Sequence, residues 1–77
     1  LFKHRPYMIN AFRKGLGDTQ ARFQVMIRKE IMAALRIKSR YQWYNRRDGK
    51  VDHTPAERAA IEAVFAKYDV TSPWGYE

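Results

Sequence analysis

The sequence predicts an all-α fold, a small four-helix domain that contains a helix-turn-helix. Apolar residues recur at helical spacing along most of the chain, and no stretch shows the alternation of a β-strand. Polar caps, prolines and glycines mark where the helices begin and end. A chain of 77 residues has the size of one domain, and its lack of cysteine excludes a disulfide framework and a zinc site built on cysteine.

Two helices are predicted in the first half, over residues 7–14 and 20–35. The Gly-Leu-Gly sequence at 15–17 is expected to end the first one, because glycine accepts the left-handed conformation that closes a helix. Asp18 or Thr19 is expected to cap the second helix through its side-chain oxygen. The second helix has no internal proline or glycine.

The next two helices are predicted from their capping sequences. Ser-Arg-Tyr-Gln at 39–42 fits a capping box, and the helix it opens runs to Arg47 before Asp-Gly closes it. Thr-Pro-Ala-Glu at 54–57 combines a threonine cap, a proline at the first helical position and a glutamate three residues after the cap. It predicts a helix over 54–68 that packs beneath the helix-turn-helix of residues 20–47.

Residues 1–77 are thus expected to form a single domain, with 1–5 as an arm and 71–77 as an irregular tail. Trp74 and Tyr76 are expected to fold back onto the core. The predicted core consists of the apolar residues on the inner helix faces: Met8, Ile9, Phe12, Phe23, Ile27, Ile31, Leu35, Ile37, Trp43, Ile61, Val64 and Phe65.

The positive charge is concentrated in the middle of the chain. The formal net charge is +7, yet residues 22–50 hold nine basic and two acidic residues, whereas 51–77 hold two basic and five acidic ones. A basic third beside an acidic third indicates a charged face that meets a polyanion. The helix over 40–47 is also rich in arginine and aromatic residues, as is typical of a nucleic-acid-binding surface.

Ten residues in this region are predicted to contact DNA. Arg40 and Gln42, in the first turn of the third helix, are expected to read base edges, because arginine pairs with guanine and glutamine with adenine. Arg47 and Lys50, at the far end, are expected to hold phosphates. The full set is Arg28, Lys38, Ser39, Arg40, Tyr41, Gln42, Tyr44, Asn45, Arg47 and Lys50.

The region 28–70 resembles the Cro and phage-repressor type of helix-turn-helix, the xenobiotic-response-element-like family. The matching features are Leu35-Arg36-Ile37 at the turn, Gly49-Lys50 after the second helix, and Thr54-Pro55 before the next one. The resemblance implies sequence-specific binding to double-stranded DNA by a bacterial or phage transcriptional regulator in the cytoplasm. The chain departs from the family where Arg36 replaces the usual glycine, and the turn and second helix are one residue longer.

Alternatives remain open at this stage. A helical hairpin can serve as a structural or protein-interaction module, for example a phage component, and the same residues can bind nucleic acid without sequence preference. Trp43 is predicted to lie in the core, the alternative being that it stacks on a base. The isolated chain is expected to be a monomer, with a homodimer on DNA left open.

Catalytic and membrane functions are not expected. His4 and His53 lie far apart, and His53 is expected in a solvated turn. No paired carboxylates, glycine-rich phosphate loop or nucleophile motif is visible, so neither an enzyme, a cofactor, a metal nor a small-molecule substrate is predicted. No apolar run has the length of a membrane span.

Overall fold

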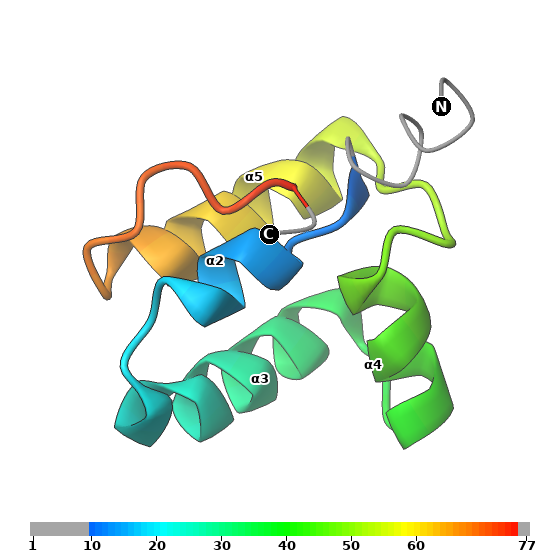
Figure 1. The fold of residues 1–77 in the computed structure, drawn as a ribbon. Coiled ribbons are helices and arrows are strands. Elements are labelled where there is room, and N and C mark those ends of the chain that lie inside the picture. The colour runs from blue at the N-terminus through cyan, green and yellow to red at the C-terminus, as the bar shows by residue number, and fades with distance from the viewer. Residues whose placement is uncertain (1–9, 76–77) are drawn as a thin grey trace.

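A computed structural model describes residues 10–75 of the chain (Figure 1). The described part is all-α, as the sequence predicts, and holds α2 (Arg13–Gly17), α3 (Ala21–Leu35), α4 (Arg40–Arg47) and α5 (Pro55–Ala66). Helices α3 and α5 pack against each other, and the residues after α5 run back across α2 (Figure 1).

The buried core agrees closely with the prediction. All the predicted core residues from Phe12 to Phe65 are buried, apart from Phe23, which is half-buried and packs against the core. Ala11 and Val70 are also buried, which was not predicted. Met8 and Ile9 lie outside the described residues.

Both capping boxes are present. The Ser39 hydroxyl accepts the backbone N–H of Gln42 at 3.1 Å, and the Gln42 side-chain oxygen accepts the N–H of Ser39. In the second box, the Thr54 hydroxyl accepts the backbone N–H of Glu57 at 3.1 Å, and the Glu57 carboxylate accepts the N–H of Thr54 at 3.0 Å. Each box satisfies N–H groups that a helix start leaves free, and this fixes where α4 and α5 begin.

The predicted end of the first helix is wrong. The glycines at 15–17 lie inside α2, and Phe12 is not helical. Instead, the Phe12 N–H donates to the carbonyl of Arg47 at 3.0 Å, and Phe12 forms a β-bridge with Gly75. These long-range hydrogen bonds break the helical ladder where local propensity predicts that it continues. The part of the predicted helix over 7–9 lies outside the described residues.

The predicted cap of α3 is also wrong. The N-cap is Gln20, and its side chain forms no capping hydrogen bond. The Thr19 hydroxyl is turned away from α3, because it donates to the carbonyl of Gly15 at 2.7 Å in a buried position. The hydroxyl therefore satisfies the end of α2 rather than the start of α3.

His53 is buried rather than solvated. Its ring centroid lies 6.1 Å from that of Phe12 and 5.9 Å from that of Trp74. Neither ring nitrogen has a hydrogen-bond partner among the described residues. Burial, with a smaller contribution from the nearby Arg46 charge, lowers the pKa of His53 from 6.5 to about 4, so the ring is neutral at pH 7.

The segment after α5 is irregular but well anchored. The carbonyls of Pro73 and Gly75 accept the backbone N–H groups of Gly15 and Lys14 at 2.9 and 3.0 Å. Trp74 folds back onto the core as predicted, and its indole N–H donates to Glu62 at 2.6 Å. Tyr76 lies outside the described residues.

We predict that Gly15→Ala destabilises the fold. A Cβ at this position would lie 2.5 Å from the Cβ and 2.8 Å from the Cα of Pro73, so backbone must move. The expected cost is about 2–3 kcal/mol of unfolding free energy, measured by urea denaturation. Gly17→Ala is the matched control, because nothing lies within 4 Å of its Cβ position, and it should be neutral or slightly stabilising. Equal losses from both substitutions would contradict the close approach at Gly15.

A second prediction concerns pH. Because the folded chain binds the His53 proton less readily than the unfolded chain, stability should fall as the pH drops from 6.5 toward 4. At about 1.4 kcal/mol per pKa unit, the loss is at most about 3.5 kcal/mol. Urea denaturation of the parent and of His53→Leu at several pH values isolates this contribution. The parent should lose more stability than the variant over that range, and parallel profiles would contradict the burial of a neutral ring.

Candidate nucleic-acid interface

A tight turn over residues 36–39 connects α3 to α4. Arg36 takes the left-handed conformation with φ 58°, and its side chain is exposed. The Ile37 N–H donates to the carbonyl of Met32 at 3.0 Å, and the Ile37 side chain is buried. The turn thus directs the chain from α3 straight into the capping box of α4.

The cations of α3, the turn and α4 are largely free of acidic partners. Seven cations on these elements or directly after α4 are exposed and form no ion pair within residues 10–75, namely Arg22, Arg28, Lys29, Arg36, Lys38, Arg40 and Lys50. The nearby acids pair with other cations: Arg46 of α4 pairs with Glu57 at 3.0 Å, and Glu30 of α3 pairs with Lys67. The unpaired positive charge therefore gathers on α3, the turn and α4.

Four of these cations surround one hollow, which we call the cationic hollow. It lies between α3 and the start of α4 and has a volume of about 300 Å³. No acidic residue lines it. Its lining residues are Arg28, Lys29, Met32, Lys38, Arg40 and Trp43. Like charges held together without acids repel one another, so such a surface is stabilised by a polyanion.

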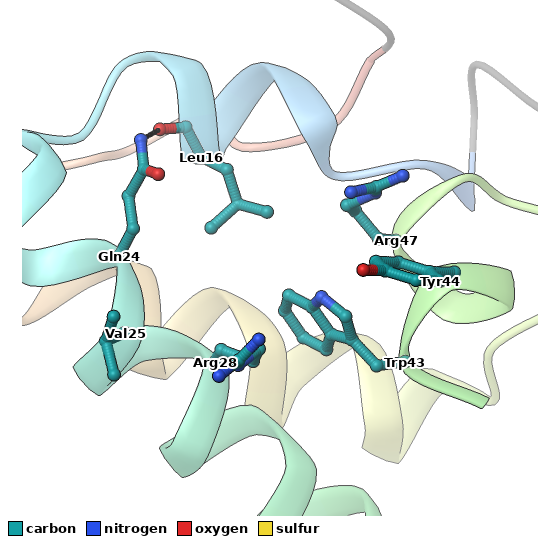
Figure 2. A pocket seen from close by; sticks show the side chains of 7 residues that line it. All are labelled: Leu16, Gln24, Val25, Arg28, Trp43, Tyr44 and Arg47. Carbon is teal, nitrogen blue, oxygen red and sulfur yellow. Dashed lines mark hydrogen bonds between the residues drawn. The ribbon is translucent and has the colours of Figure 1, made fainter. Parts of the chain in front are cut away.

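A second hollow, the indole hollow, also lies against Trp43 (Figure 2). It has a volume of about 230 Å³ and is formed by three helices, α2, α3 and α4. The residues that line it are Leu16, Gln24, Val25, Arg28, Trp43, Tyr44 and Arg47. Arg28 and Trp43 line both hollows, so the two are adjacent.

Arg47 is held in place by two neighbours. Its guanidinium donates to the carboxylate of Asp48 at 2.8 and 3.2 Å. The same group lies 4.7 Å from the ring centroid of Tyr44 (Figure 2). Arg47 is therefore only half exposed and partly neutralised, which makes it a weaker phosphate ligand than the sequence predicts.

The predicted DNA-contacting residues mostly lie on the outside of α3, the turn and α4. Arg28, Lys38, Ser39, Arg40, Tyr41, Gln42, Tyr44 and Lys50 are exposed, whereas Asn45 and Arg47 are half-buried. Tyr41, whose placement the sequence left open, is 75% exposed. Trp43 is 3% exposed and lies in the core as predicted, so neither face of its ring is free to stack on a base.

The side-chain oxygen of Gln42 is occupied by the hydrogen bonds that cap α4. Its side-chain oxygen accepts the backbone N–H of Lys38 at 3.2 Å and that of Ser39 at 3.5 Å. Recognition of adenine by glutamine uses the oxygen and the amide nitrogen together. Because the oxygen already accepts these bonds, Gln42 can contact a base only through the N–H donors of its amide nitrogen.

Sequence reasoning missed several residues that line the hollows. Lys29 and Met32 line the cationic hollow, and helical spacing on the exposed side of α3 could have found Lys29. Leu16, Gln24 and Val25 line the indole hollow, which depends on how α2 packs against α3 and α4. No local sequence signal indicates that packing.

No protein-family model, curated protein or solved structure matches this chain. Within residues 10–75, no group of three histidine, cysteine or acidic side chains could hold a metal ion. The helices of the same region are too short or too polar to cross a membrane. The exposed cations on α3, the turn and α4 are therefore the feature of the described residues that bears on function.

We predict that Arg36→Gly stabilises the chain. A side chain at φ 58° clashes with its own backbone at a cost of about 1 kcal/mol, which glycine avoids. Thermal and urea denaturation should show a gain of about that size. Ala63→Gly, on the exposed side of α5, is the control and should lose about 1 kcal/mol. A loss of stability in both variants would show that Arg36 contributes a contact that outweighs its strain.

Proposed function

We propose that this chain binds double-stranded DNA through α3 and α4, with α4 as the helix that enters the major groove. The observation that carries the proposal is the set of seven exposed cations without an ion pair on α3, the turn, α4 and the residues directly after α4. Phosphate neutralisation by such cations supplies most of the affinity of proteins for nucleic acid. A small transcriptional regulator of a bacterium or phage, acting in the cytoplasm, fits this proposal.

The start of α4 supports base reading. Arg40 is the first residue of the helix and Tyr41 the second, and both are exposed. In a helix-turn-helix the N-terminal residues of the second helix meet the base edges. Arg40 can pair with guanine through two hydrogen bonds, whereas Gln42 is restricted by its cap. We therefore assign the main base contact to Arg40.

We assign the phosphate contacts to the cations around Arg40. Arg28, Lys29 and Lys38 line the cationic hollow together with Arg40. Lys50 follows α4 at its far end and is exposed. These residues hold the DNA backbone without reading sequence.

A second candidate function is binding to nucleic acid without sequence preference. It is favoured by the cap bonds of Gln42 and the ion pair of Arg47 with Asp48, which leave fewer side chains free to read bases. The two functions predict different responses to single substitutions, because a base contact affects specificity and a phosphate contact affects affinity.

The experiment is a competition titration with a duplex selected from a random pool and with random duplex, at two salt concentrations. The parent should prefer the selected duplex by about 10³ or more. Arg40→Ala should reduce that preference by about 1–3 kcal/mol. Lys50→Ala should weaken binding to both duplexes alike and lower the salt slope by about one unit.

Lys67→Ala is the matched control, since it removes one exposed cation from outside α3 and α4. It should leave affinity and preference almost unchanged. Equal weakening on both duplexes by Arg40→Ala and Lys50→Ala would favour binding without sequence preference. Absence of affinity for any duplex would refute the proposed function.

A further inference from the structure

The indole nitrogen of Trp43 is a hydrogen-bond donor without a protein acceptor. The side chain is 3% exposed, and within residues 10–75 its N–H forms no hydrogen bond. Figure 2 shows the ring projecting from α4 into the indole hollow, with its nitrogen on an edge that faces this space. Among the described residues, the fully buried side-chain nitrogens without a partner are those of His53, so the Trp43 nitrogen is not sealed in the core but reaches the hollow, where it can donate to a ligand.

The other tryptophan, Trp74, has an acceptor for its indole N–H. The indole N–H of Trp74 donates to the carboxylate of Glu62 at 2.6 Å, although Trp74 is less buried than Trp43. The chain therefore satisfies one indole donor internally and leaves the more deeply buried one directed into a hollow.

The charge of the indole hollow favours an anion. Arg28 lines it and forms no ion pair or hydrogen bond within the described part of the chain. Arg47 also lines it, and its charge is partly offset by Asp48. Gln24 contributes no free donor of equal strength, because its amide nitrogen already donates to the carbonyls of Leu16 and Thr19 at 2.8 and 3.3 Å. The strongest free donors are thus the indole N–H and the Arg28 guanidinium.

We propose that the indole hollow is a phosphate-binding site in which Trp43 and Arg28 donate to the same phosphate group. A phosphate carries oxygens on all sides, so one group can accept from an indole and from a guanidinium that approach from different helices. Arginine binds phosphate through charge-assisted hydrogen bonds in a fixed fork geometry. The volume of about 230 Å³ leaves room for the group.

The phosphate can come from two sources. One is a backbone phosphate of bound DNA, which would place DNA over the α2 side of Trp43 as well as over the start of α4. The other is a free phosphate, inorganic or carried by a mononucleotide. Only the first source depends on the proposed function.

The test is a titration of the ¹⁵N-labelled chain, following the two indole N–H signals by NMR. The signals are assigned with Trp74→Phe. Inorganic phosphate, a mononucleotide and a random duplex are added in separate titrations at constant ionic strength. The Trp43 signal should move with at least one of them, while the Trp74 signal, already bonded to Glu62, stays in place.

Two variants test whether Arg28 is the cation that binds the phosphate. Arg28→Gln should weaken the Trp43 response by about tenfold, as expected for loss of a charge-assisted hydrogen bond. Lys67→Gln is the matched control, because it removes the same charge from an exposed residue that lines neither hollow. It should leave the response to inorganic phosphate unchanged.

The outcomes separate the two proposals. A Trp43 shift with inorganic phosphate or the mononucleotide supports a free-anion site even if no duplex binds. A shift with duplex alone, sensitive to Arg28→Gln, supports the backbone source. The site is refuted if no addition moves the Trp43 signal, if both indole signals move alike, or if both glutamine variants weaken the response equally.

Discussion

The arrangement of this small domain depends on the packing around Phe12. Its ring is fully buried and meets four other aromatic rings, those of Trp43, Phe65, His53 and Trp74, at centroid distances of 5.4, 5.9, 6.1 and 6.2 Å. Its backbone N–H also donates to the carbonyl of Arg47 at the end of α4. One residue thus holds α4, α5 and the C-terminal segment together. In a chain this short, such shared burial replaces a larger core.

The packing around Phe12 determines which side of α4 is exposed. Because Trp43 is held against Phe12, the opposite side of α4 faces outward, and it carries Tyr41. Arg40, one turn before Trp43, is exposed at the edge of the cationic hollow. The nearby acids pair with other cations, as Glu57 does with Arg46 on the half-buried side of α4, so the exposed cations of α3, the turn and α4 form no ion pair within the described residues. The proposed DNA-binding surface follows from these two constraints, one steric and one electrostatic.

Local signals in the sequence predicted the parts of the fold that local interactions fix. The capping boxes of α4 and α5 were predicted residue by residue, because each box is complete within four consecutive residues. The break at Phe12, the approach of Gly15 to Pro73 and the burial of His53 were not predicted. Each depends on residues far away in the chain, such as Gly75 for the break at Phe12 and Phe12 for the burial of His53. Likewise, the charge of the candidate site was visible in the sequence, but its hollows were not.

The central claim is that α3 and α4 together form the surface that meets nucleic acid. The most direct measurement is a map of backbone amide shifts in the ¹⁵N-labelled chain as a random duplex is added. The account predicts that the largest shifts fall within residues 28–50 and that the exposed side of α5 around Glu62 is unaffected. Shifts centred on α5, or no shifts at a duplex concentration that saturates known DNA-binding domains, would contradict it.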